Sequence, residues 1–262
     1  MIQTIIQIAL EAGAKIMEIY AKDFEIEFKD DKSPLTEADK ASNAIIVEGL
    51  KKNFDYPLIS EEEKEIAYDL RSKYERYWLI DPIDGTKEFI KRNGEFTVNI
   101  ALIEKGVPIG GVVYAPAIKE LYYADDNGAF KASDVDVDTS IDEINLKAKK
   151  LHKSQITDQN SKIIRVVASK SHLSPETQAF IDDLKKDYDE VEVVSKGSSL
   201  KLCMVADGTA DIYPRFAPTM EWDTGAGQAI CEIAGYQVLN WPEKSPLRYN
   251  RENMLNGWFM VR

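Results

Sequence analysis

The chain has 262 residues, with 45 acidic and 33 basic side chains and a formal net charge of −12. This charge argues against general binding to nucleic acid or to an anionic membrane surface. The length allows one large α/β domain or two packed subdomains. The N-terminus lacks a basic leader segment, no apolar run is long enough to span a membrane, and the two cysteines show no disulfide or metal-binding pattern. We therefore expect a cytoplasmic protein without an integral membrane segment.

The first elements are predicted by apolar spacing and by a helix cap. Apolar side chains three and four residues apart predict an amphipathic helix over residues 2–20. A short edge strand is expected at residues 24–28, followed by a turn over residues 29–34. Thr36 can cap a second helix, and Asp39 lies at the capping-box position three residues later. On their own, Thr36 and Asp39 indicate an ordinary helix start.

The stretch over residues 78–97 places two carboxylates directly after a buried strand. The apolar residues 77–80 are followed by Asp81-Pro82-Ile83-Asp84-Gly85-Thr86. In open α/β sheets, ligands bind at the carboxyl ends of strands, and the proline disfavours a helix through Asp81. Two carboxylates that face one point repel each other unless a cation lies between them, and oxygen ligands suit Mg²⁺ or Mn²⁺. The same pattern is also typical of a turn with a capping aspartate.

Two further acids follow predicted element boundaries. Glu61 comes after a strand expected at residues 57–60, and Asp223 opens a helix expected at residues 223–235. Each also fits the first turn of a helix, where acids are favourable. Together with Asp81 and Asp84, they would supply oxygen ligands for two or more hard cations. Such a site clamps a phosphate and lowers the pKa of a bound water.

The remaining elements indicate an antiparallel sheet followed by an α/β layer. Strands are expected at residues 97–104, 107–115, 121–124, 129–130, 163–168, 191–194, 211–213, 236–239 and 258–261, and further helices at residues 174–186 and from about 195–199 to 206. The polar segment 132–162 is predicted to be a linker or surface excursion. Its aspartates do not fit a calcium loop, because the glycine and the glutamate that such a loop requires are absent.

One alternative mechanism is disfavoured by spacing. Phosphatases that form an aspartyl-phosphate carry Asp-x-Asp-Gly-Thr, with the first aspartate as the nucleophile. Here Pro82 stands two residues before Asp84, so no carboxylate occupies the nucleophile position. A metal-activated water is therefore favoured over a covalent intermediate.

These linked motifs resemble the inositol monophosphatase superfamily of Mg²⁺-dependent, lithium-sensitive phosphatases. The resemblance rests on residues 81–86, on Ser60-Glu61-Glu62 and on residues 222–226. Residues 87–102, 197–201 and 213–216 are closely similar to the bacterial CysQ-type 3′(2′),5′-bisphosphate nucleotidases. The resemblance covers nearly the whole chain and outweighs the capping interpretations.

The resemblance implies an α+β / α/β layered sandwich with alternating α-β-α-β-α layers, as in inositol monophosphatase and fructose-1,6-bisphosphatase. We expect an N-terminal helix and antiparallel-sheet subdomain over residues 1–145 and a C-terminal α/β subdomain over residues 146–262. The site would lie at their junction. Most metal ligands belong to the first subdomain, and Asp223 with the substrate-recognition residues belongs to the second.

The resemblance also implies roles for individual residues. The metal ligands are Glu61, Asp81, Asp84, Asp223 and the backbone carbonyl of Ile83, for two or three Mg²⁺ ions that Mn²⁺ can replace. Glu61 fits best among the three consecutive glutamates because it follows Ser60 directly. The pair Asp39 and Thr86 matches the residues that orient and deprotonate the attacking water, since a hydroxyl and a carboxylate can act as a relay. The substrate-binding residues are Glu61, Gly85, Thr86, Ser198, Lys201, Arg215, Asp223 and His172.

A second phosphate needs donors of its own. Ser198 and Lys201 at a helix start supply amides and a cation, and Arg215 beside Tyr213 and Phe216 offers a cation with flat faces for adenine or phosphate. The ordinary alternatives are a helix cap for Ser198 and a solvated side chain for Arg215.

The implied reaction is hydrolysis of the 3′-phosphate of adenosine 3′,5′-bisphosphate to AMP, in the clearance of a by-product of sulfate assimilation. The sulfated form of this nucleotide is a further candidate substrate. Peripheral association with the inner face of the cell membrane stays open at this point. The alternatives are an inositol monophosphatase and a non-catalytic, metal-dependent nucleotide-binding protein.

Overall fold

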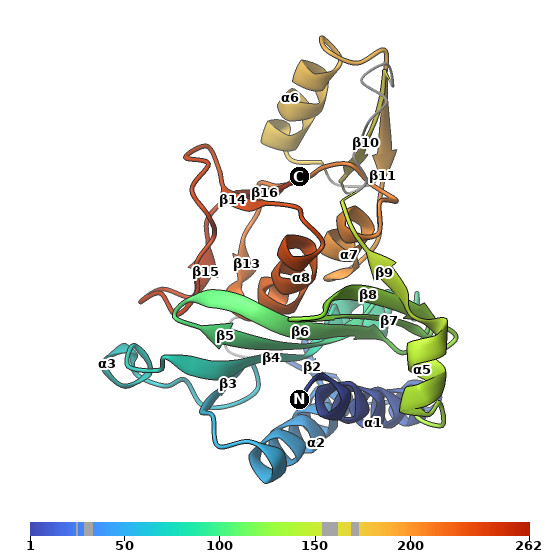
Figure 1. Cartoon of the computed structure of the whole chain (residues 1–262), viewed down its shortest axis with the longest axis vertical. Coiled ribbons are helices and arrows are strands. Elements are labelled where there is room, and N and C mark those ends of the chain that lie inside the picture. The colour runs from blue at the N-terminus through green and yellow to red at the C-terminus, as the bar shows by residue number, and fades with distance from the viewer. Residues whose placement is uncertain (25, 29–33, 154–161, 169–172) are drawn as a thin grey trace.

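Helices α1 (Ile2–Tyr20) and α2 (Glu37–Asn53) cover one face of a central sheet (Figure 1). The structure is a computed structural model that describes residues 1–24, 26–28, 34–153, 162–168 and 173–262. The amphipathic helix predicted for residues 2–20 is confirmed, and its apolar side chains share a core with those of the sheet. Within the described ranges, no helix combines the length and apolar character that crossing a bilayer requires.

The first turn of α2 forms the predicted capping box. The Thr36 hydroxyl accepts a hydrogen bond from the backbone N–H of Ala38 at 3.2 Å. In return, the Thr36 N–H donates to Asp39 Oδ2 at 2.8 Å. Thr36 is buried, so this cap lies inside the molecule and not at its surface.

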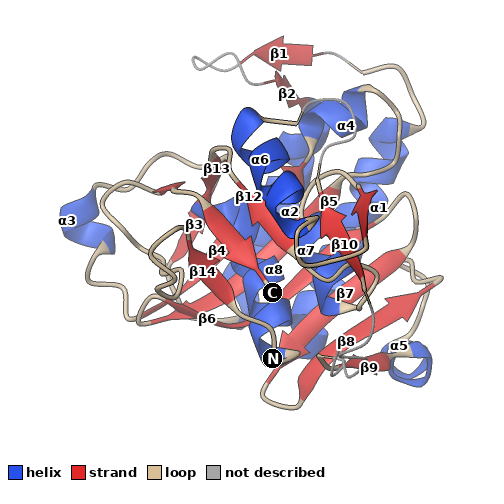
Figure 2. Cartoon of the chain, turned by 90° about the horizontal axis from the view of Figure 1, so that it is seen from above, coloured by secondary structure: helices blue, strands red, loops and turns tan. Residues whose placement is uncertain are grey.

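A small hairpin precedes α2. Strands β1 (Ile26–Phe28) and β2 (Pro34–Thr36) pair antiparallel and lie near the short helix α4 (Thr86–Ile90), as Figure 2 shows. The edge strand is confirmed over three residues. β2 was not predicted, because it follows a turn-rich run and begins with a proline.

The central sheet contains seven strands in the order β3-β4-β5-β6-β7-β8-β9. They are β3 (Leu58–Ser60), β4 (Arg76–Asp84), β5 (Thr97–Glu104), β6 (Val107–Ala115), β7 (Glu120–Asp125), β8 (Gly128–Ser133) and β9 (Lys149–Leu151). β3 and β4 run parallel, whereas the other neighbours are antiparallel. The predicted hairpin of β5 and β6 and the two strands after it are confirmed.

The parallel pairing of β3 with β4 brings two strand ends to one edge of the sheet. Ser60 pairs with Ile80, and the Glu61 N–H donates to the Ile80 carbonyl at 3.2 Å. Because the strands run in the same direction, Glu61, which follows β3, lies at the level of Asp81 near the end of β4.

A bulge in β4 lies just beyond this point. Asp81 pairs with Asn99 and Asp84 pairs with Thr97, so β4 contains one more residue than β5 between the two pairs. Pro82 lies within the bulge, where its missing N–H removes no regular ladder bond. Both aspartates therefore belong to a stretch of strand that departs from regular pairing.

The described part of segment 132–162 contains regular structure, and the prediction of a linker is wrong there. Helix α5 (Ile141–Lys147) begins at Ser140, whose hydroxyl accepts from the Glu143 N–H at 3.3 Å. The Glu143 carboxylate accepts from the Ser140 N–H at 2.9 Å. This Ser-x-x-Glu signal is readable from sequence, but the polar surroundings obscured it. β9 has only Leu151 buried, so no apolar pattern marked it.

Helices α7 (Leu200–Ala206) and α8 (Glu221–Ile233) cover the other face of the sheet and form a second large core with it (Figure 1). Beyond them lie β10 (Ile163–Val167), β11 (Glu190–Val194), β12 (Tyr213–Arg215), β14 (Val238–Asn240) and β16 (Phe259–Val261), with α6 (Pro175–Leu184) outermost. The alternating layers confirm the predicted fold class. The division at residue 145 stays a prediction. The very short strands β13 (Thr219–Met220) and β15 (Leu255–Asn256) and the helix α3 (Tyr68–Arg71) were not specifically predicted.

A buried ion pair fixes the first turn of α8. Glu221 is fully buried, and its carboxylate accepts from the N–H groups of Asn250 at 2.8 Å and Arg251 at 3.1 Å. The Arg251 Nε donates to the same carboxylate at 3.0 Å. Burial raises the pKa of Glu221, so the arginine and the two amides are needed to hold its charge.

Replacing Arg251 with Met should lower the free energy of unfolding by about 2 kcal/mol, because it leaves a buried carboxylate without its cation. Urea denaturation measures this change. The matched control is Lys186→Met, which removes an exposed ion pair with Asp183 and should change stability by less than about 0.5 kcal/mol. Equal effects of the two substitutions would contradict the assignment of Arg251 as the anchor of α8.

Candidate active site

Carboxylates from separate elements converge at the edge of the central sheet. One oxygen from each of Glu61, Asp81 and Asp223 lies within 4.8 Å of the others. Asp84 lines the same hollow, which has a volume of about 430 Å³. Glu61 follows β3, the two aspartates end β4, and Asp223 lies in the first turn of α8. We call these four side chains the acidic cluster.

The electrostatics of the acidic cluster are unfavourable without a cation. Asp81 is only 1% exposed. Burial raises its pKa well above the ordinary value, and repulsion from Glu61 and Asp84 adds to the rise. Burial also raises the pKa of Asp223, with Asp84 as the largest neighbouring charge. The donor set is made of carboxylate oxygens, with Asp81 buried and Glu61, Asp84 and Asp223 partly exposed to the hollow. These residues therefore fit hard divalent cations.

The three consecutive glutamates have different surroundings. Glu61 belongs to the acidic cluster, whereas Glu63 accepts a hydrogen bond from Asn43 Nδ2 at 2.8 Å. Ser60 Oγ donates to the Asn43 oxygen at 2.7 Å, which ties the end of β3 to α2. The geometry therefore brings Glu61 to the other carboxylates and directs Glu63 to α2.

Thr86 and Asp39 lie within hydrogen-bonding distance of each other. The Thr86 hydroxyl donates to Asp39 Oδ1 at 3.2 Å, and its distance to the Ile83 carbonyl oxygen is 3.4 Å. The other oxygen of Asp39, Oδ2, accepts from the Thr36 hydroxyl at 2.6 Å and from the Thr36 N–H. One carboxylate thus closes the helix cap with one oxygen and contacts Thr86 with the other.

Gly85 is required by the backbone at the start of α4. Its φ is +94°, in the left-handed region. A Cβ at this position would lie 3.2 Å from Ser198 Cβ and 3.3 Å from the Glu95 carbonyl oxygen. The close approach joins the turn after β4 to the loop before α7, so both contribute to the wall of the hollow.

Basic side chains line the side of the hollow formed by the C-terminal half. Lys201 Nζ donates to the Ser198 carbonyl at 3.0 Å. Arg215 donates to the Pro218 carbonyl at 3.1 Å, while its Nε is buried without a hydrogen-bond partner among the described residues. Ser198, Lys201 and Arg215 also line a smaller recess of about 70 Å³ beside Tyr213.

The expectation that Phe216 offers a flat face to a ligand is wrong. Its side chain is 7% exposed, and its ring centroid lies 6.1 Å from that of Trp241 and 5.3 Å from that of Trp258. Phe180 completes this cluster. The neighbouring rings cover Phe216, whereas Tyr213 and Phe259 are among the residues that line the recess. His172 lies outside the described residues.

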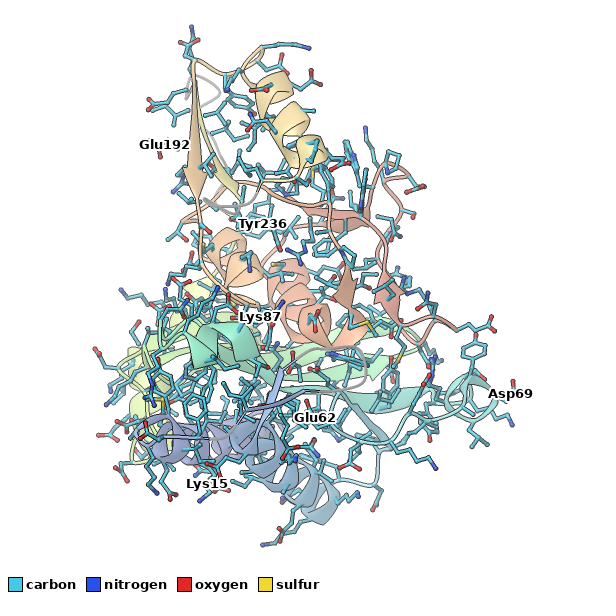
Figure 3. All side chains as sticks on the ribbon, turned by 180° about the vertical axis from the view of Figure 1, so that it is seen from behind. Lys15, Glu62, Asp69, Lys87, Glu192 and Tyr236 are labelled. Carbon is cyan, nitrogen blue, oxygen red and sulfur yellow. The ribbon has the colours of Figure 1, made fainter. Side chains whose placement is uncertain are left out.

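Three residues that the sequence interpretation did not single out also belong to the site. Lys87 and Glu88 line the hollow, and Figure 3 shows Lys87 on α4, close to the layer formed by α7 and α8. Ser199 hydrogen-bonds to Asp84. Their adjacency to Gly85-Thr86 and to Ser198 was a signal, but adjacency alone does not reveal which side chains face the hollow.

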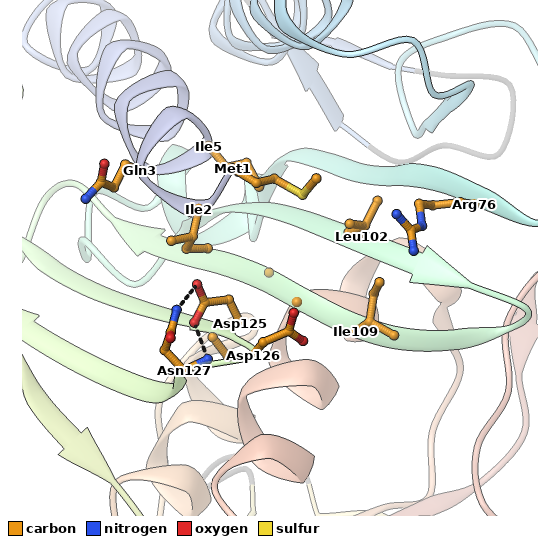
Figure 4. Close-up of a pocket in the computed structure, with 13 residues that line it drawn as sticks. Met1, Ile2, Gln3, Ile5, Arg76, Leu102, Ile109, Asp125, Asp126 and Asn127 are labelled. Atoms are coloured by element: carbon orange, nitrogen blue, oxygen red, sulfur yellow. Dashed lines mark hydrogen bonds between the residues drawn. The ribbon is translucent and has the colours of Figure 1, made fainter.

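A second hollow of about 420 Å³ lies beside the start of α1 (Figure 4). Its acids belong to the turn between β7 and β8. Asp125 accepts from the N–H of Asn127 at 2.9 Å and from its side-chain amide at 3.0 Å. These bonds are those of an ordinary turn, so the chemistry of the chain is better sought at the acidic cluster.

Comparison with known proteins identifies the family. The profile of the inositol monophosphatase family matches residues 1–257. The chain is 44% identical to the 3′(2′),5′-bisphosphate nucleotidase CysQ of Salmonella typhimurium (strain LT2), with 100% of this chain and 99% of the relative covered. It is 43% identical to the protein of the same name from Escherichia coli (strain K12), with the same shares covered.

Solved structures agree with this assignment. The crystal structure of CysQ from Bacteroides thetaiotaomicron, a bacterial member of the inositol monophosphatase family, is 47% identical with a TM-score of 0.86, and the match covers 99% of this chain and 95% of that chain. An inositol monophosphatase from Anabaena (Nostoc) sp. shares the fold at 24% identity and a TM-score of 0.72, over 99% of this chain and 89% of that chain. The chain therefore belongs to the inositol monophosphatase family, a family of phosphatases that generally depend on metal ions.

Proposed function

We propose that the chain hydrolyses the 3′-phosphate of adenosine 3′,5′-bisphosphate to AMP and phosphate, with Mg²⁺ as the metal. The observation that carries this proposal is a single hollow that combines carboxylates with cations. The acidic cluster and Thr86 line it together with Lys87, Lys201 and Arg215. A substrate with two phosphates fits such a hollow, because one phosphate can be cleaved while the other is held by cations. The names of the relatives at 43–44% identity support the same substrate.

The acidic cluster would hold the metal, together with the backbone carbonyl of Ile83. We expect two or three Mg²⁺ ions, which Mn²⁺ can replace. Bound there, divalent cations would neutralise charge on the phosphate and lower the pKa of a bound water. The side chains of the cluster are already gathered around one point, so the protein keeps its ligands preorganised.

Thr86 and Asp39 together would accept the proton of the attacking water. The Thr86 hydroxyl would accept a hydrogen bond from the water while it donates to Asp39 Oδ1, 3.2 Å away. A threonine alone is too weak a base, whereas a hydroxyl backed by a carboxylate can take up the proton. Pro82 stands where an aspartyl nucleophile would be needed, so attack by water fits this sequence better than a covalent intermediate.

Ser198, Lys201 and Arg215 would bind the second phosphate, and Tyr213 beside the recess would contact the nucleoside. This assignment is supported by the position of the three side chains, which line both the hollow and the smaller recess beside it. His172 stays a predicted contact on the substrate side. Gly85 and Thr86 would hold the scissile phosphate through their amides.

A comparison of two substrates tests the proposal. Phosphate release from adenosine 3′,5′-bisphosphate and from inositol 1-phosphate is measured at equal concentration in Mg²⁺, with the sulfated nucleotide as a third arm. We expect kcat/KM for the bisphosphate to exceed that for inositol 1-phosphate by about 10- to 150-fold, because one charged contact contributes roughly 1.5–3 kcal/mol. Lithium should inhibit the reaction. A clear preference for inositol 1-phosphate would make the chain an inositol monophosphatase instead.

A non-catalytic nucleotide-binding protein is the second alternative. It is disfavoured because Asp39 and Thr86 are hydrogen-bonded to each other, and Thr86 lines the same hollow as Glu61, Asp81, Asp84 and Asp223. We place the enzyme in the cytoplasm, where it would remove a by-product of sulfate assimilation. The two cysteines are free and buried, which fits a reducing compartment. Peripheral membrane association has no support in the described residues and is not part of the proposal.

A further inference from the structure

Ser199 precedes α7 at the N-cap position but does not cap the helix. Its φ and ψ are −66° and −9°, and its side chain makes no capping hydrogen bond. A serine at an N-cap ordinarily accepts from an N–H in the first turn of the helix. Here Ser199 Oγ lies 2.7 Å from Asp84 Oδ2 and 2.7 Å from the backbone oxygen of Asp223. Helix capping therefore does not explain this residue.

Two buried polar side chains of β5 support the Ser199 hydroxyl. Asn99 Nδ2 donates to Ser199 Oγ at 2.8 Å, and the Thr97 hydroxyl donates to Asn99 Oδ1 at 3.0 Å. Thr97, Asn99 and Ser199 are 0%, 1% and 2% exposed. Asparagine is uncommon in strands, and a buried amide is unfavourable unless it is hydrogen-bonded. We call these three side chains the positioning chain.

The positioning chain directs the one hydroxyl hydrogen of Ser199. The Asn99 amide accepts from the Thr97 hydroxyl through its oxygen and donates to Ser199 Oγ through its nitrogen. Because Ser199 Oγ accepts from Asn99, its own hydrogen must point to Asp84 or to the Asp223 carbonyl. A bond to a carboxylate is the stronger of the two. The same oxygen thus links Asp84 at the end of β4 with the start of α8.

We infer that Ser199 is a positioning residue that orients Asp84 as a metal ligand and sets its distance from Asp223. This inference rests on the proposed metal-dependent function. Residues that hydrogen-bond to metal ligands fix the orientation of those ligands, and their loss typically lowers metal affinity by about 10–100-fold. The loop before α7 therefore serves the metal site through Ser199 and the substrate through Ser198.

Calorimetric titration of Mn²⁺ alone into the full chain, after metal removal by a chelator, tests the inference. Ser199→Ala should bind Mn²⁺ about 10–100-fold more weakly than the wild type. Thr97→Val, which keeps the shape of the side chain, should cause a smaller loss because the Asn99 amide can still donate to Ser199. In the double variant the losses should not add, because both act through one chain of hydrogen bonds.

Two serine variants serve as controls. Ser198→Ala should raise KM for the nucleotide without changing Mn²⁺ affinity, because among the described residues the Ser198 hydroxyl makes no hydrogen bond to Asp84 and lies 3.4 Å from Thr97 Oγ1. Ser140→Ala removes a helix cap far from the site and should lower the melting temperature only. If the role of Ser199 is purely structural, Ser199→Ala should behave like Ser140→Ala, with a lower melting temperature and unchanged Mn²⁺ affinity.

The outcomes separate this inference from the proposed function. Unchanged Mn²⁺ affinity in Ser199→Ala overturns the inference, whatever the substrate is. If the wild type binds Mn²⁺ but does not hydrolyse the nucleotide, the proposed substrate is wrong and a weakened Ser199→Ala still supports the inference. If the wild type binds no Mn²⁺ at millimolar concentration, both proposals fail.

Discussion

Replacing Asp39 with Asn should reduce kcat by about 10³-fold and leave Mg²⁺ affinity nearly unchanged, because a positioned proton acceptor contributes roughly 10²–10⁴-fold. Asp39 is not among the carboxylates that converge within 4.8 Å. Its role depends on the 3.2 Å hydrogen bond from Thr86, and an amide cannot take the proton that this bond would deliver. Steady-state kinetics across a range of Mg²⁺ concentrations measures both quantities.

The control for this substitution is a second capping box in the same chain. Glu143 accepts from the Ser140 N–H at 2.9 Å, as Asp39 does from Thr36, but Glu143 lies far from the site. Glu143→Gln should therefore lower stability slightly without affecting kcat. Thr86→Val should resemble Asp39→Asn, and the double variant should be little worse than either single variant. An Asp39→Asn enzyme that keeps kcat within tenfold of the wild type would exclude the relay.

Replacing Asp81 with Asn should stabilise the metal-free protein while abolishing its response to Mg²⁺. Asp81 is almost fully buried, and burial and neighbouring carboxylates raise its pKa. A neutral amide removes that repulsion. Relief of about 1–2 kcal/mol corresponds to a rise in melting temperature of roughly 3–6 °C for a chain of this size. Thermal unfolding in the presence of a chelator measures the rise.

The same substitution changes the pH dependence of the metal-free protein. The folded state binds a proton at Asp81 more tightly than the unfolded chain does. Stability therefore falls as the pH rises from about 4 toward the raised pKa. In the Asp81→Asn variant, this contribution to the decrease in stability with rising pH should be absent. With Mg²⁺ at about 100 times its dissociation constant, the wild type should gain roughly 2.7 kcal/mol and the variant nothing.

Asp142→Asn provides the reference for Asp81→Asn. Asp142 is exposed in the first turn of α5, so removing its charge should lower the melting temperature by no more than about 2 °C. A metal-free Asp81→Asn protein that melts below the wild type would show that the carboxylate is satisfied by hydrogen bonds and is not held against repulsion.

Strong local signals explain the parts of the fold that the sequence predicts well. β5 and β6 are found at their predicted bounds because two apolar runs flank Lys105-Gly106, and both of these residues have positive φ values. The first helix has an uninterrupted apolar stripe. β9 and β2 were missed because each has three residues and pairs at a sheet edge.

The sequence predicted the site residues only where a recognisable motif lies near the end of a predicted strand. Glu61 follows β3 and Asp81 lies near the end of β4, and the parallel pairing of these strands brings the two residues together. Ser199 and Asn99 carried no comparable signal. Ser199 belongs to a run of residues that begins a helix, and Asn99 lies in an otherwise apolar strand. Their bonds join positions 100 residues apart, which local pattern does not encode. The prediction for Phe216 was wrong for a related reason, because the rings that cover it come from distant segments of the chain.

The Asp39 carboxylate takes part in both the helix cap and the contact with Thr86, and this limits which substitutions the position can accept during evolution. Its Oδ2 closes the first turn of α2, and its Oδ1 receives the Thr86 hydrogen bond. The hydrogen bonds that close the first turn of α2 therefore also fix the orientation of the Asp39 carboxylate toward Thr86. A variant that abandons catalysis would still be under pressure to keep an acid at this position. An intact Asp39 in a relative of this chain is therefore weaker evidence of activity than an intact Thr86.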